Sequence, residues 1–147
     1  GISFSSIYLI VAIAAAQHTG KKTADLCYLI DVFPTLCDML QLPVPQSVDG
    51  ISLLSSLDGK EPVRDYLYYS YMDNQRGISD GTWKLIEYHV NGKRTTQLFN
   101  LKNDPWERND LSGQKKYEKT IQRLREKMAE EQKRTNDTSV FWNNFNY

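Results

Sequence analysis

The chain has 147 residues, and its eighteen basic and eighteen acidic side chains give a formal net charge of zero at pH 7. This balance gives no reason to expect a nucleic-acid partner or an anionic membrane, because both favour a basic surface. Two histidines are too few for a histidine-built metal centre, and Cys27 and Cys37 lack the close Cys/His spacing of a zinc site. The two cysteines allow a disulfide, but Cys37 falls in a predicted helix, which favours a buried thiol.

The first predicted element is a buried strand over residues 7–14, which are apolar and rich in β-branched side chains. Residues 7–16 also resemble the apolar part of a signal peptide. No initiator Met or basic residue precedes them, however, and the run is too short to cross a bilayer. We therefore expect a strand and no membrane segment. Because the chain begins on Gly1, we also expect a fragment of a longer protein.

A helix is predicted from Asp31 to about Leu40. Asp31 can cap the first free N–H groups of this helix, and Pro34 lies in its first turn, where a missing N–H is tolerated. Residues 41–50 contain two prolines and end in Asp-Gly, so they are predicted to form a loop. One short helical turn is expected over residues 52–57.

Four strands are predicted next, over residues 66–71, 76–79, 83–90 and 94–101. The first shows the alternation of a strand with one more apolar face. Asn91-Gly92, between the third and fourth strands, is the strongest turn signal in the chain, because both positions of a type I′ turn need a positive φ. Short connections of this kind predict an antiparallel sheet in simple sequential order.

A long amphipathic helix is predicted over residues 114–133, where Ile121, Leu124 and Met128 recur at helical spacing. The aromatic tail, residues 141–147, is expected to pack against the protein. Together these elements predict an α+β fold, in which a four-stranded antiparallel sheet is packed by a long C-terminal helix and preceded by a strand and a helix.

Five segments carry a family resemblance: Asp31-Val-Phe-Pro-Thr35, Asp49-Gly-Ile-Ser-Leu53, Trp83-Lys-Leu-Ile86, Leu98-Phe-Asn-Leu101 and Asp104-Pro-Trp-Glu107. Each segment alone is a weak signal. In this order, with the predicted strands and helix between them, they resemble the C-terminal region of sulfatases of the alkaline-phosphatase superfamily, over residues 19–142. An arylsulfatase-like parent protein is the expectation that follows.

The resemblance implies that the chain divides near residue 60. Residues 1–60 would be the last elements of a large α/β catalytic domain, left over from the sulfatase core, and residues 61–147 would be the C-terminal subdomain. The expected partner is then the missing N-terminal sulfatase domain. Without it, we expect exposed apolar surface around residues 7–11 and Phe33, or self-association that hides this surface.

Chemically, the resemblance implies hydrolysis of sulfate esters by a formylglycine, made from the Cys or Ser of a Cys/Ser-x-Pro-x-Arg motif, with a calcium ion. The residues two positions before the five prolines are Val32, Gln41, Pro43, Lys60 and Asn103, so this motif is absent. We therefore expect no catalytic residue, no metal ligand and no cofactor in this chain, and no activity from the chain alone. Calcium and formylglycine would belong to the parent protein, a sulfuric ester hydrolase.

Arg76 and Asn74 are the candidate substrate-binding residues. In the family the small sheet can border the substrate cleft, so the polar loop that contains Asp73, Asn74, Gln75 and Arg76 could contact a sugar or a second sulfate. The alternative is that Arg76 is solvated or forms a salt bridge, as most arginines near turns do.

Two other functions remain open. The chain could be a stand-alone carbohydrate-binding or interaction module that uses the aromatic residues 66–71 and the aromatic tail. It could also be the C-terminal part of a related phosphodiesterase or phosphonate hydrolase. For a sulfatase, the resemblance implies a sulfated substrate, with a glycan the first choice, and a parent that is exported to the periplasm or outside, or lysosomal.

Overall fold

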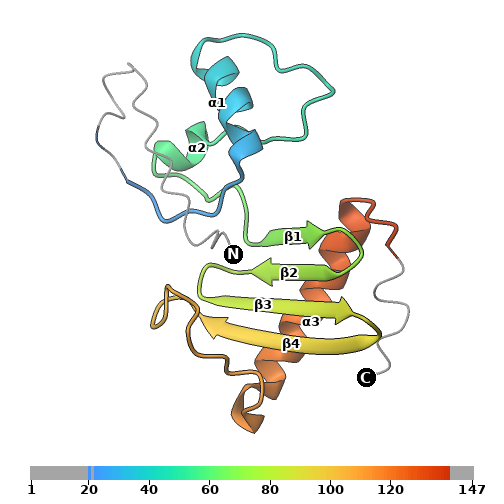
Figure 1. The fold of residues 1–147 in the computed structure, drawn as a ribbon. Coiled ribbons are helices and arrows are strands. Elements are labelled where there is room, and N and C mark those ends of the chain that lie inside the picture. The colour runs from blue at the N-terminus through green and yellow to red at the C-terminus, as the bar shows by residue number, and fades with distance from the viewer. Residues whose placement is uncertain (1–19, 21, 140–147) are drawn as a thin grey trace. The chain divides into compact units, whose positions relative to one another are not determined.

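The computed structural model describes residue 20 and residues 22–139, and Figure 1 shows the arrangement of the elements. The predicted strand over residues 7–14 and the aromatic tail lie outside these residues. The chain forms two compact units that divide between Leu67 and Tyr68. No helix among the described residues is long and apolar enough to cross a membrane.

The first unit holds the 3₁₀ turn η1 (Leu29–Asp31) and the helices α1 (Val32–Met39) and α2 (Leu54–Leu57). Helix α1 ends close to the predicted position. The chain reverses at Gln41, which has a φ of 56°, and the N–H of Leu42 returns to the carbonyl of Cys37 at 2.8 Å. A residue in this left-handed conformation turns the following N–H groups back to the last carbonyl groups of a helix, and the helix ends there.

Asp31 occupies the N-cap position of α1, as predicted, but its side chain does not cap the helix. Asp31 is the last residue of η1, and its carboxylate makes no capping hydrogen bond to the amides of α1. Its backbone is helical (φ −76°, ψ −14°) and not extended, as a capping residue usually is, and the carboxylate binds instead to segments before and after the helix.

Apart from Leu67, the first residue of β1, the second unit contains the strands β1 (Leu67–Tyr71), β2 (Gln75–Ser79), β3 (Trp83–Val90) and β4 (Lys93–Asn100). They form one four-stranded antiparallel sheet in the order β1-β2-β3-β4, which confirms the predicted topology (Figure 1). The turn between β3 and β4 confirms the Asn91-Gly92 prediction, since φ is 52° at Asn91 and 71° at Gly92.

One face of this sheet packs against helix α3 (Glu118–Arg134), which follows the 3₁₀ turn η2 (Lys115–Tyr117) (Figure 1). The register places Leu85 opposite both Ile78 and Leu98, so these three side chains share a face, and all three are fully buried. Leu124 and Met128 of α3 are also fully buried. A buried side chain of this size contributes about 1.5–3 kcal/mol through the hydrophobic effect, so this layer is the core of the second unit.

Candidate functional site

The carboxylate of Asp31 is the centre of the first unit. It is completely buried, and its Oδ2 accepts a hydrogen bond from the N–H of Tyr28 at 2.7 Å. Its Oδ1 accepts from the N–H of Ile51 at 2.8 Å and from Nη2 of Arg64 at 2.6 Å. The Arg64 guanidinium also lies 4.8 Å from the centre of the Tyr28 ring. A single carboxylate therefore joins three segments, which explains why a charged side chain can be buried here.

The helix α1 and the loop after residue 48 are joined by further hydrogen bonds. Thr35 Oγ1 donates to the carbonyl of Asp31 at 2.5 Å and accepts from the N–H of Leu53 at 2.9 Å. Gly50 lies so close to η1 that an added Cβ would overlap the carbonyl oxygen of Ile30 and lie 2.8 Å from the carbonyl carbon. Hydrogen bonds therefore join the segments Asp31–Thr35 and Asp49–Leu53. The residues that carry the family resemblance here hold the backbone of these two segments together.

Two other segments of the family resemblance, Trp83–Ile86 and Asp104–Glu107, meet on the sheet of the second unit. Nζ of Lys84 lies 2.9 Å from Oε1 and 3.0 Å from Oε2 of Glu107, and both side chains are mostly buried. The turn that carries Glu107 is held by Asp104, whose Oδ2 accepts the N–H groups of Arg108 and Asn109, each at 2.8 Å. Lys84 and Glu107 thus connect β3 to the loop that follows β4.

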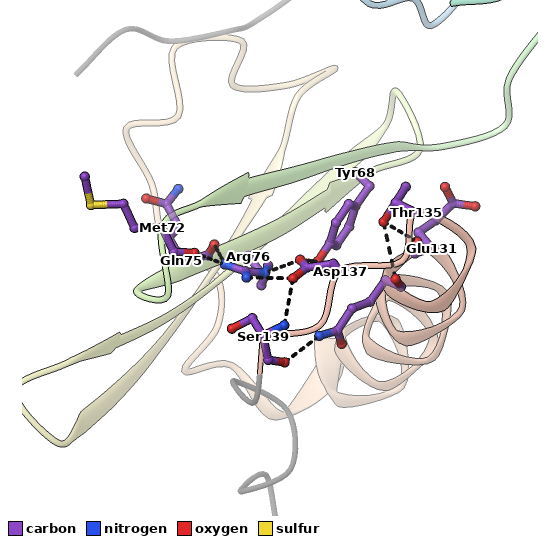
Figure 2. Close-up of polar contacts among 9 residues, drawn as sticks. Tyr68, Met72, Gln75, Arg76, Glu131, Thr135, Asp137 and Ser139 are labelled. Atoms are coloured by element: carbon purple, nitrogen blue, oxygen red, sulfur yellow. Dashed lines mark hydrogen bonds and ion pairs between the residues drawn. The ribbon is translucent and has the colours of Figure 1, made fainter. Parts of the chain in front are cut away.

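Arg76, a predicted substrate-binding residue, is 2% exposed and points into the second unit (Figure 2). Its Nε and Nη2 bind the two carboxylate oxygens of Asp137 at 2.6 and 3.0 Å. Its Nη1 donates to the carbonyls of Met72 at 2.6 Å and Gln75 at 2.8 Å. Tyr68 donates its hydroxyl to Asp137 at 2.7 Å. These contacts fix the β1–β2 turn to the segment that follows α3.

The other predicted residue, Asn74, is exposed at the β1–β2 turn. Its backbone N–H donates to the carbonyl of Tyr71 at 3.3 Å, and its carbonyl accepts from the N–H of His89 at 2.8 Å. The Arg76 guanidinium thus contacts Asp137 and two backbone carbonyls, while Asn74 lies exposed at the turn. Asp137 carries no local sequence signal for this role, because it lies 61 positions from its partner Arg76.

The network shifts two pKa values in opposite directions. Partial burial is the largest effect on Asp137 and acts to raise its pKa, but hydrogen bonds from Arg76, Tyr68 and the N–H of Ser139 together outweigh it and lower the pKa. Burial, followed by the hydrogen bond to Asp137, raises the pKa of Tyr68. At neutral pH the carboxylate is therefore charged and the phenol is a hydrogen-bond donor.

Among the described residues, no group of three or more His, Cys, Asp or Glu side chains could hold a metal ion. The first unit does carry exposed apolar side chains: Leu29 is 70%, Ile30 55% and Phe33 52% exposed. The expectation of apolar surface around Phe33 is confirmed, whereas residues 7–11 lie outside the described residues.

The chain resembles known sulfatases in sequence. It is 28% identical over 141 residues to an N-acetylglucosamine-6-O-sulfatase of Bacteroides thetaiotaomicron, an alignment that covers 88% of this chain and 25% of the relative. It is also 28% identical over 116 residues to an arylsulfatase of Clostridium perfringens, with 76% and 24% of the two chains covered. The chain thus spans about a quarter of the length of these curated relatives.

The fold of the chain is also similar to that of solved sulfatase structures. A structure in complex with its substrate D-glucosamine-2-N,6-O-disulfate superimposes with a TM-score of 0.62 at 27% identity, covering 76% of this chain and 25% of the other. A 2-O GAG sulfatase gives a TM-score of 0.59 at 28% identity, covering 73% and 25%. A phosphonate monoester hydrolase from Silicibacter pomeroyi, at 20% identity and a TM-score of 0.56 over 75% of this chain and 26% of that one, shares the fold.

The family model for the C-terminal region of N-sulphoglucosamine sulphohydrolase matches residues 3–134, which is most of the chain. The matched region includes all five segments of the resemblance. The chain therefore belongs to this family and is a sulfatase C-terminal domain of the alkaline phosphatase superfamily.

Proposed function

We propose that this chain is the C-terminal portion of a sulfatase whose catalytic centre lies in a preceding part of the protein. In this proposal residues 1–60 complete the large catalytic domain and residues 61–147 form the C-terminal subdomain. The formylglycine and the calcium ion belong to the preceding part. The chain alone is inactive, and its role is to complete the fold and border the substrate cleft.

The observation that carries the proposal is the apolar surface of η1 and α1. Leu29, Ile30 and Phe33 expose more than half of their surface, although the backbone that presents them is fixed by the buried Asp31 and Thr35. A rigid apolar patch of this kind is typical of a surface that another part of a protein covers. The relatives provide such a part, since about three-quarters of their length lies outside the alignment with this chain.

Arg64 supports the same role. Its Nη1 is buried and has no hydrogen-bond acceptor among the described residues. A buried N–H without an acceptor costs about 1–3 kcal/mol, so an acceptor supplied from outside residues 22–139 would stabilise this donor.

For the substrate, we propose a sulfated glycan, with a sulfated glucosamine as the first candidate. The support comes from the relatives, which include an N-acetylglucosamine-6-O-sulfatase and a structure in complex with D-glucosamine-2-N,6-O-disulfate. We also propose that Asn74 borders the cleft at the exposed end of the β1–β2 turn, and that Arg76 holds this turn in place through Asp137.

The test starts from the DNA upstream of this reading frame. An in-frame Cys/Ser-x-Pro-x-Arg motif is expected there, and the complete protein should release sulfate from D-glucosamine-2-N,6-O-disulfate. The upstream part and this chain, expressed separately, should each be inactive and recover activity when they are co-expressed. Phe33→Asp should abolish recovery, whereas Trp106→Asp, at a side chain that is 74% exposed in the second unit, should not.

An upstream region without a nucleophile motif would remove the sulfatase proposal. Cleavage of a phosphonate monoester in preference to the sulfate ester would instead assign the protein to the related hydrolases.

A further inference from the structure

The β3–β4 hairpin carries a hollow of about 610 Å³. The register places Tyr88 opposite Thr95 and Val90 opposite Lys93, so these side chains share one face of the hairpin. Glu87 and Thr96, which bind Arg125 of α3, lie on the other face. The hollow is therefore on the face turned away from α3. Its lining among the described residues is Tyr88, Val90, Asn91, Lys93, Thr95 and Gln97.

The charge of this lining favours an anion. Lys93 is exposed and is the one charged side chain among the described residues that line the hollow. Within residues 22–139, its ammonium group forms no ion pair. An exposed ammonium that is not already neutralised can pair with a sulfate or a carboxylate.

The uncharged part of the lining is fixed in a defined position. The hydroxyl of Tyr88 donates to Oε1 of Gln97 at 3.0 Å, which holds the phenol ring across the two strands. Burial, followed by the carboxylates of Glu107 and Asp110, raises the pKa of Tyr88, so the phenol keeps its proton and remains the donor. The Gln97 amide then directs its two N–H donors to other acceptors.

This set of groups matches a sugar. An aromatic ring, two amides and a hydroxyl within one hollow can contact a pyranose ring and hydrogen-bond its hydroxyl groups. The volume of about 610 Å³ lies within the usual range of small-ligand sites and suits one or two sugar rings.

We propose that this hollow is a subsite for a sulfated sugar residue. The sugar ring packs against Tyr88, its hydroxyl groups bind Asn91, Thr95 and Gln97, and its sulfate pairs with Lys93. The choice of a sulfated glycan as the ligand comes from the proposed function, and the inference rests on that proposal for the identity of the ligand.

The test is a titration of the ¹⁵N-labelled 147-residue chain, followed by the amide shifts of residues 88–97. D-Glucosamine-2-N,6-O-disulfate is the probe, N-acetylglucosamine tests the ring without sulfate, and inorganic sulfate tests the anion without the ring. Saturable shifts confined to this hairpin are expected from the disulfate, with weaker binding of either comparison ligand.

Matched variants complete the test. Lys93→Gln should lower the affinity for the disulfate about fivefold, because one exposed charge pair contributes about that much to binding. Lys115→Gln, at an exposed lysine of η2, should leave binding unchanged. Equal binding of the disulfate and inorganic sulfate would overturn the sugar subsite, as would equal affinities of the wild-type chain and Lys93→Gln. The absence of saturable hairpin shifts up to about 20 mM, the range of very weak ligands, would also overturn it.

The result is independent of the test of the proposed function, because binding is measured on this chain without the upstream part. If the complete protein has sulfatase activity but the amide signals of the hairpin do not shift, only the subsite proposal is disproved. Hairpin binding together with an upstream region that lacks the nucleophile would remove the sulfatase proposal alone.

Discussion

The ammonium group of Lys84 contacts both carboxylate oxygens of Glu107, a residue 23 positions later in the chain, and both side chains are mostly buried. Glu107 has a φ of 53°, an unusual conformation for a residue other than glycine or asparagine. The turn therefore accepts backbone strain in order to place this carboxylate against β3.

Replacement of Lys84 by Met should destabilise the chain by about 3 kcal/mol, because the Glu107 charge would remain mostly buried without its partner. Urea denaturation of the variant would measure the change in the free energy of unfolding. Lys127→Met is the matched control, since the pair Lys127–Glu130 is exposed on α3 and should contribute less than about 0.5 kcal/mol. An equal effect of the two substitutions would contradict a specific role for Lys84.

Gly50→Ala should destabilise the first unit by more than about 2 kcal/mol, since the added Cβ meets backbone atoms of Ile30 that cannot move without breaking the Asp31 contacts. Gly113→Ala is the control, because nothing lies within 4 Å of an added Cβ there. That variant should be neutral or slightly more stable. Hydrogen exchange of the amides of Ile51 and Leu53, which donate to Asp31 and Thr35, would measure the local effect.

Asp137→Asn should lower stability by about 2 kcal/mol at pH 7, because it removes a charged acceptor from Arg76 and Tyr68. The pKa of Asp137 is lowered in the folded state from its ordinary value of 3.8. Its contribution is therefore complete above pH 3.8 and is lost as the pH falls through the lower, folded value.

Urea denaturation between pH 7 and pH 2 should accordingly show the wild-type chain and Asp137→Asn converging at acid pH. Asp73→Asn, in the exposed β1–β2 turn, provides the comparison. A stability difference for Asp137→Asn that stays constant down to pH 2 would contradict the assignment.

The chain should self-associate through Leu29, Ile30 and Phe33, because their exposed surface is apolar. Phe33→Ser should shift the population towards monomer in sedimentation measurements over a range of concentrations. Trp106→Ser removes an equally exposed aromatic side chain and should leave the association unchanged. A wild-type chain that stays monomeric at high concentration would disprove this prediction.

The sequence predicted the second unit well because local rules determine it. Asn91 and Gly92 specify a two-residue turn, the strands alternate, and Ile121, Leu124 and Met128 recur at helical spacing. The observed strand ends differ from the predicted ones by one residue at most, and the 114–133 helix is divided into η2 and α3.

The side-chain partners could not be predicted in the same way. Asp31 is a good helix cap in isolation, but it binds Ile51 and Arg64, which lie 20 and 33 positions later. Arg76 next to a polar turn indicated a surface residue, and its burial depends on Asp137 beyond the far end of α3. Contacts of this separation depend on how elements pack, which no local pattern encodes.

The hydrogen bonds that join α1 to the following loop also bear on how such chains are classified. Asp31, Thr35 and Gly50 carry part of the family signature, and each has a role in holding the backbone together. Loss of hydrolysis in a descendant would remove no constraint on these positions. A gene can therefore retain a recognisable sulfatase signature long after its product has ceased to cleave any ester, and the signature reports ancestry and architecture, while turnover has to be measured.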